Sequence, residues 1–166
     1  MSCWLATRWI AAEMALRLSP RIAGAVLINS VGIDAAKPEL SIVDPTAVPP
    51  EERSALAFHD PQKFAFAAST PEAAAAMVDN QKALRTYAGE PFMHEPTLRS
   101  RLAKMPIPTL VIWGESDRIV RPDYGRLLAS SIPQSRYAPV AAAGHFPQIE
   151  QLEEVERLIS GFVDGL

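Results

Sequence analysis

Two short apolar runs, at residues 24–30 and 108–114, lack polar alternation until their ends. That pattern is typical of strands buried on both faces of a parallel sheet. A third, shorter strand is predicted at 136–140. Helix-forming residues and apolar positions at helical spacing predict helices at 9–18, 51–58, 70–87, 96–104, 123–130 and 148–163. Strands and helices therefore follow one another as in an open α/β sheet with parallel strands.

The stretch between the first two strands has a different composition. Residues 34–105 are rich in proline and alanine and hold no strong strand, so we expect a helical insertion between 1–33 and 106–166. Thr70-Pro71-Glu72 combines an N-cap, a first-turn proline and an acidic residue, which predicts a helix start. The last helix carries an apolar stripe that we expect to pack against the sheet. Its members are Ile149, Leu152, Val155, Leu158, Ile159 and Phe162.

Composition and charge exclude several classes of protein. A chain of 166 residues suits one domain, or one domain with an insertion. The net charge of −3 argues against nucleic-acid binding, which needs clustered positive charge. No apolar run approaches the roughly 20 residues that cross a bilayer, and no secretion signal is evident. The single cysteine, Cys3, permits no internal disulfide, so we expect a cytoplasmic protein.

Two candidate functional residues lie just past predicted strand ends, where open α/β sheets carry functional groups. Asp117 follows the strand at 108–114, and His145 follows the strand at 136–140. They are 28 positions apart (145 minus 117), so both loops can open on one edge of the sheet. A carboxylate that accepts the imidazole Nδ1–H orients the ring and leaves Nε2 to take a proton from a nucleophile.

Simpler interpretations stand beside this one. The histidine alone is also typical of a loop residue that caps the next helix, and the aspartate of a turn residue or a partner for Arg118 or Arg121. Glu115 is a rival acid. The other histidines, His59 and His94, are most simply solvated or packed in the insertion. No spacing of ligand-type residues predicts a metal site, and no glycine-rich phosphate loop is present, so no cofactor is expected.

Two segments resemble a known superfamily. Trp113-Gly114-Glu115-Ser116-Asp117-Arg118-Ile119-Val120 and Gly144-His145-Phe146-Pro147-Gln148-Ile149-Glu150 look like the acid and histidine loops of α/β-hydrolases. The similarity covers about residues 9–165. It implies Asp117 as triad acid, His145 as general base and residues 34–105 as the cap over the pocket. It also implies a serine hydrolase that cleaves carboxylic esters or related carbonyl bonds without a metal or organic cofactor.

The start of the chain departs from that family. The superfamily places its serine in a Gly-x-Ser-x-Gly turn before the first helix. Here Leu5 falls at the serine register, and Thr7 and Arg8 fall at glycine positions. About five upstream strands that the resemblance implies are also missing. We expect an incomplete α/β-hydrolase fold of about three parallel strands, arising from a misassigned start, a frameshift or a truncation.

The sequence therefore predicts a hydrolase relative with little activity of its own. Ser2 and Cys3 are not in the register of the nucleophile and do not replace it. The alternative is a non-enzymatic fragment or pseudo-hydrolase that binds a partner. The strand at 24–30 would leave an apolar backbone edge unpaired, which predicts self-association. A small apolar ester is the substrate expected of a full-length relative, from the cap residues Phe58, Phe64, Phe66, Met77, Tyr87, Phe92 and Met93, although these could equally form the core of the cap.

Overall fold

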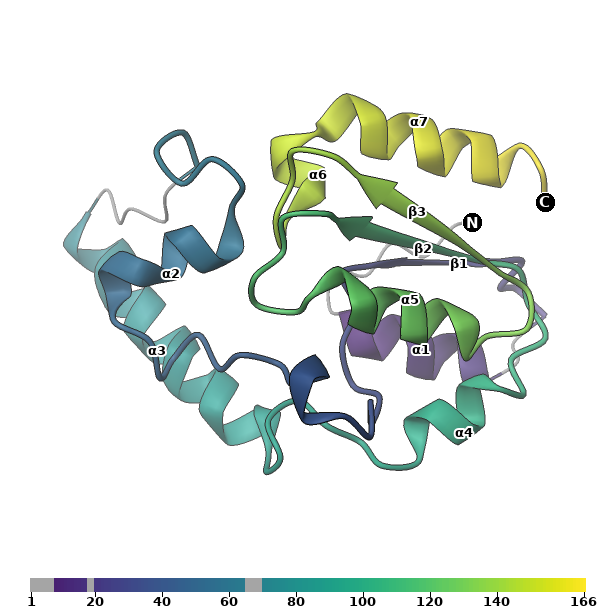
Figure 1. Ribbon diagram of the computed structural model, residues 1–166, viewed down its shortest axis with the longest axis horizontal. Coiled ribbons are helices and arrows are strands. Elements are labelled where there is room, and N and C mark those ends of the chain that lie inside the picture. Colours follow the sequence, from purple (N-terminus) through teal and green to yellow (C-terminus); the bar gives the residue numbers. More distant parts are fainter. Residues whose placement is uncertain (1–7, 18–19, 65–69) are drawn as a thin grey trace.

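The computed structural model describes residues 8–17, 20–64 and 70–166, and strands alternate with helices along the chain (Figure 1). Leu5, Ser2, Cys3 and Phe66 lie outside the described residues. In chain order the elements are α1 (Arg8–Leu16), β1 (Ala25–Ile28), a 3-10 turn (Pro38–Leu40), α2 (Pro50–Ala57), α3 (Pro71–Ala88), α4 (Leu98–Leu102), β2 (Thr109–Gly114), α5 (Pro122–Ser130), β3 (Ser135–Val140), α6 (Pro147–Glu150) and α7 (Leu152–Val163).

The three strands form one parallel sheet in the order β1-β2-β3. Leu27 pairs with Val111, and Val111 pairs in turn with Tyr137. This confirms the predicted α/β class with three parallel strands. Among the described residues, β1 pairs with β2 and with no other strand.

Helices cover both faces of the sheet, with α7 on one side and α1 and α5 on the other (Figure 1). Because successive side chains of a strand point to opposite faces, β2 contributes to both cores. Leu110 and Ile112 pack with Val155 and Ile159 of α7. Val111 and Trp113 lie in the larger core on the other face. Each such fully buried side chain stabilises the fold by about 1.5–3 kcal/mol relative to an exposed one.

The predicted helix at 148–163 is wrong in one respect, because it is broken at Gln151. The backbone of Gln151 has φ −134° and ψ 55°, and its side-chain amide donates to the carbonyl oxygen of Ala142 at 3.0 Å. The break turns two members of the apolar stripe away from the sheet. Ile149 and Leu152 are 49% and 54% exposed, whereas Val155 and Ile159 are buried.

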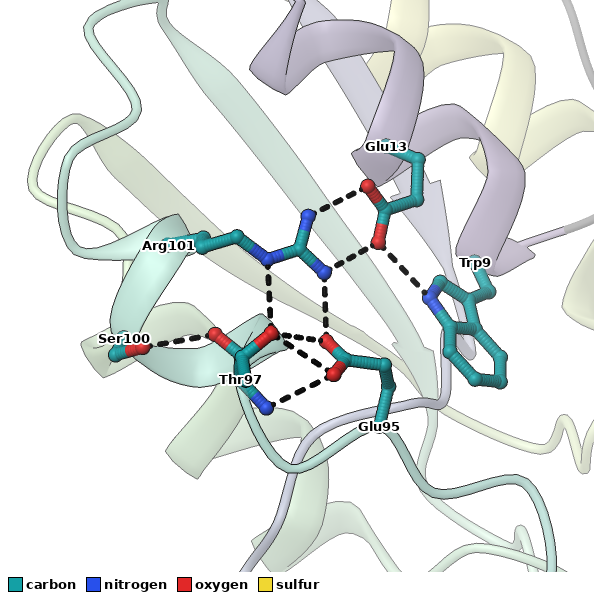
Figure 2. Close-up of polar contacts among 6 residues, drawn as sticks. All are labelled: Trp9, Glu13, Glu95, Thr97, Ser100 and Arg101. Carbon is teal, nitrogen blue, oxygen red and sulfur yellow. Dashed lines mark hydrogen bonds and ion pairs between the residues drawn. The ribbon is translucent and has the colours of Figure 1, made fainter.

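A charged cluster ties α4 to α1 (Figure 2). The guanidinium of Arg101 donates to both carboxylate oxygens of Glu13 at 2.6 Å and to Glu95 at 2.6 Å. These hydrogen bonds hold the pKa values of Glu13 and Glu95 below their ordinary value of 4.5. The contacts fix where residues 95–101 return to the body of the fold.

Two helices of the predicted insertion, α3 and α4, differ in how they contact the rest of the fold. Thr70 Oγ1 accepts the Ala73 N–H at 3.2 Å, which confirms the predicted N-cap of α3. Leu98 and Leu102 of α4 are fully buried in the larger core beside α1. Most of α3 is exposed, and α2 and α3 lie beyond the carboxyl ends of β2 and β3 (Figure 1). The division into core and cap at residues 34–105 stays a prediction.

Within the described part of the chain, no helix combines the length and apolarity that a bilayer crossing requires.

Candidate catalytic site

The loops after the three strands meet at one edge of the sheet. Asn29 directly follows β1, Asp117 lies in the turn after β2, and His145 lies in the loop after β3. Parallel strands present their carboxyl ends together, which is why residues far apart in sequence converge here. The sequence predicted two members of this group, Asp117 and His145, and the structure brings them into contact.

The imidazole of His145 and the carboxylate of Asp117 form a buried pair. Nδ1 and Oδ2 lie 2.7 Å apart, with side-chain exposures of 10% and 0%. With Nδ1–H donating to the carboxylate, Nε2 is the ring nitrogen able to accept a proton from a nucleophile, and the carboxylate stabilises the imidazolium that forms. The geometry is that of an oriented general base.

The carboxylate of Asp117 is satisfied on both oxygens. Oδ1 accepts the backbone N–H groups of Ile119 at 2.8 Å and Val120 at 2.9 Å, so this oxygen closes the turn after β2. Oδ2 accepts from His145 and from the side-chain amide of Asn29 at 2.6 Å. A buried carboxylate needs such partners, because burying an ion without them costs several kcal/mol. Asp117 is therefore both the turn residue and the partner of the histidine.

The rival acid Glu115 and the alternative partner Arg118 do not fit the geometry of the pair. Glu115 is exposed, with its backbone N–H on the carbonyl oxygen of Val140. Arg118 lies away from Asp117: its Nη1 donates to the carbonyl oxygen of Ala55 at 2.5 Å. Asp117 is thus the carboxylate that the structure places beside the imidazole.

Asn29 is the site residue that the sequence analysis missed. Its backbone has φ 43°, a left-handed conformation that asparagine tolerates better than most residues. Its Oδ1 accepts the Gly114 N–H at 3.2 Å, and its Nδ2 donates to Asp117. The signal that could have found it is its place: a polar residue at the carboxyl end of an apolar strand.

Two glycines allow the site loops to approach so closely. A Cβ on Gly114 would lie 1.9 Å from the carbonyl oxygen of Gly144. A Cβ on Gly144 would lie 2.3 Å from the carbonyl oxygen of Ala57, at the end of α2. Both distances are far below van der Waals contact, so only glycine fits at these positions.

The other two histidines have partners of their own. His59 Nδ1 lies 2.7 Å from Ser116 Oγ, and His94 Nε2 lies 4.0 Å from Asp34 Oδ2. Of the predicted pocket aromatics, Phe58 is buried and packs against Phe64, whereas Tyr87 is 84% exposed. Within the described ranges, no three His, Cys, Asp or Glu side chains are grouped to hold a metal ion.

Comparison with known proteins shows which family this chain matches. A family model described as "Alpha/beta hydrolase family" matches residues 1–158. Over 65 residues the chain is 35% identical to Lipase 3 of Moraxella sp. (strain TA144), which is 39% of this chain and 21% of that protein. Over 68 residues it is 40% identical to a 2-hydroxy-6-oxononadienedioate/2-hydroxy-6-oxononatrienedioate hydrolase of Pseudomonas putida, which is 41% of this chain and 24% of that protein.

Solved structures match over more of the chain. A meta-cleavage product hydrolase from Pseudomonas fluorescens IP01 (CumD) superposes with a TM-score of 0.69 at 21% identity, covering 94% of this chain and 61% of that one. At this identity the likeness concerns the fold. The chain thus spans about six tenths of that structure, and the segments aligned with the two curated relatives are under a quarter of their length.

Proposed function

The chain belongs to the alpha/beta hydrolase family, and on that premise we propose that Asp117 and His145 are the acid and the base of a serine-hydrolase triad. The observation that carries the proposal is the buried 2.7 Å contact between Nδ1 and Oδ2, at the carboxyl ends of adjacent parallel strands. The substrate class we infer is a small apolar carboxylic ester or a related carbonyl compound. The names of the relatives, a lipase and a dienedioate hydrolase, support hydrolysis.

The two residues divide the chemistry between them. In a full-length relative that carries the serine, the base at the position of His145 takes the proton from the serine hydroxyl through Nε2 as the oxygen attacks the carbonyl carbon, and returns it to the leaving group as the acyl-enzyme forms. Asp117 holds the ring in the required tautomer throughout and stabilises its positive charge. Asn29 and the amides of 119–120 keep the carboxylate in place. These steps need no metal and no organic cofactor, and we place the protein in the cytoplasm because its single cysteine permits no internal disulfide.

In this 166-residue chain we propose that the reaction runs at little or no rate. Leu5 occupies the serine register, and leucine offers no nucleophilic atom. In the family pattern the turn that carries the serine also supplies one oxyanion-hole amide, and removal of one such donor typically costs about 10²–10³ in rate. The histidine and its carboxylate then have no hydroxyl group to deprotonate.

Hydrolysis of a short-chain p-nitrophenyl ester tests this proposal. We expect the same rate from the chain, from His145→Ala and from a mock purification. Turnover that His145→Ala abolishes, while the mock purification stays silent, would show a working nucleophile and contradict the inactivity.

A second candidate is a non-enzymatic partner-binding fragment, favoured by the pairing of β1. Within the described residues, the backbone of β1 is paired on the β2 side alone, and an open apolar edge is a template for another strand. A partner-binding fragment should fold alone and bind its partner saturably. The open edge itself predicts concentration-dependent self-association in light scattering, and a monodisperse monomer with a cooperative thermal transition would contradict that self-association.

A further inference from the structure

The carboxylate of Glu150 joins the loop that carries His145 (residues 141–146, the histidine loop) to the end of α2. Glu150 Oε2 accepts the Gly144 N–H at 2.6 Å. Glu150 Oε1 accepts the N–H groups of His59 at 2.9 Å and of Asp60 at 3.2 Å. Three backbone amides from two segments, more than 80 residues apart in sequence, therefore converge on one side chain. Hydrogen bonds to an ionised acceptor are about twice as strong as neutral ones.

Hydrogen bonds in the reverse direction, from amides of the site loops to carbonyl oxygens of α2, strengthen this junction between the histidine loop and α2. The carbonyl oxygen of Ala57, in the last turn of α2, accepts the His145 N–H at 2.6 Å, and that of Leu56 accepts the Arg118 N–H at 3.2 Å. The site loops thus satisfy carbonyl groups that a helix end leaves without intrahelical partners. The missing side chain of Gly144 permits the approach, because a Cβ there would meet Ala57. Each side of the junction therefore both donates and accepts hydrogen bonds.

This exchange brackets His145. Its own N–H is held by Ala57, and the N–H of the preceding residue is held by Glu150. The imidazole must reach Asp117 within 2.7 Å, so the backbone of the histidine loop has to be fixed in space. Next to the histidine, Phe146 packs against Phe58 with ring centroids 5.6 Å apart, which adds apolar contact to the same junction.

We propose that Glu150 is a positioning residue for His145, acting by fastening the histidine loop to residues 57–60. The role rests on the proposed function of the Asp117–His145 pair. It assigns the end of α2 to the rigid frame of the site, so residues 57–60 move with the histidine loop and not as a separate lid. Glu150 does not touch the reacting atoms.

Two NMR measurements on the full chain test this. In the unaltered protein, the amides of Gly144, His59 and Asp60 should be protected from hydrogen exchange. Glu150→Gln keeps one acceptor oxygen and replaces the other by an amide nitrogen that cannot accept, so either the Gly144 amide or the amides of His59 and Asp60 should exchange about tenfold faster or more. The signal of the His145 Nδ1 proton should broaden or vanish while the spectrum of the sheet is retained. The matched control is Glu156→Gln on the exposed face of α7, which should change neither.

The outcomes separate the two proposals. Fast exchange of these amides in the unaltered chain overturns the junction without recourse to any variant, which covers the case in which Glu150→Gln fails to fold. A folded Glu150→Gln with an unchanged Nδ1 proton signal overturns the positioning role alone. Absence of that signal in the unaltered chain counts against the proposed Asp117–His145 pair instead.

Discussion

Replacing Asn29 by aspartate is the most incisive change that the site offers. The two side chains have the same shape, and aspartate also tolerates the left-handed backbone at this position. The substitution exchanges the amide nitrogen 2.6 Å from Asp117 Oδ2 for a carboxylate oxygen. Two unit charges at that distance repel by about 6 kcal/mol at an effective dielectric constant of 20.

Taking up a proton is the less costly outcome for the variant. Holding a carboxyl of ordinary pKa near 3.9 protonated at pH 7 costs about 4 kcal/mol, less than the repulsion. The introduced carboxyl therefore keeps a proton in the folded state and donates it to Asp117. Because its folded pKa is raised above the unfolded one, stability is retained near pH 4 and is lost as pH rises. We expect Asn29→Asp to be about 4 kcal/mol less stable than the unaltered chain at pH 7. This difference in the free energy of unfolding should shrink by about 1.4 kcal/mol for each unit by which the pH is lowered.

Urea unfolding at several pH values between 4 and 7 measures this difference. With a slope near 2 kcal/mol per molar, the midpoint at pH 7 should fall by about 2 M. Asn80→Asp on the exposed face of α3 is the matched control and should differ from the unaltered chain by less than about 0.5 kcal/mol throughout. If both variants show the same pH dependence, Asn29 does not face the Asp117 carboxylate.

Three further changes test the frame around the site. Gly114→Ala should cost more than about 4 kcal/mol in urea unfolding, because its Cβ would lie 1.9 Å from a backbone oxygen, whereas Gly161→Ala, which meets nothing within 4 Å, should stabilise α7 by about 0.5–1 kcal/mol. Tyr124→Phe should lower the unfolding free energy by about 1–3 kcal/mol, since its hydroxyl accepts the amides of residues 32–33, and an unchanged stability would contradict those bonds. Glu13→Gln should lower the free energy of unfolding by less than about 1 kcal/mol at pH 7. Because the arginine of α4 lowers the folded pKa of this glutamate, the difference from the unaltered chain should vanish as pH falls below 4.5. A difference that persists in acid would contradict the ion pair.

The sequence pattern was sufficient for the sheet and its two facing loops. Continuous apolar runs at 24–30 and 108–114 predicted β1 and β2, since a strand buried on both faces has no polar side chains along its length. The position of Asp117 and His145 after strand ends predicted their proximity, because parallel strands end at one edge. Thr70 predicted the start of α3 through its own side-chain chemistry.

What the pattern missed depends on tertiary contacts. The apolar spacing continues through Gln151, so periodicity alone does not reveal the break that exposes Ile149 and Leu152. Asn29 acts through Asp117, 88 residues away in sequence, and Glu150 joins the nearby Gly144 to His59 and Asp60, which are 91 and 90 residues away, so the periodicity of the chain does not reveal either role. Only their placement, after a strand and after the histidine loop, sets them apart from other polar residues.

The hydrogen bond between His145 Nδ1 and Asp117 is the centre of this account, and NMR of the chain labelled with ¹⁵N-histidine measures it directly. The protein has three histidines, so His145→Gln assigns the signals. We predict that His145 is the Nδ1-protonated tautomer and that its Nδ1 proton gives a far-downfield resonance, which moves or disappears in Asp117→Asn. An Nε2-protonated tautomer for His145, or a spectrum that Asp117→Asn leaves unaltered, would contradict the account.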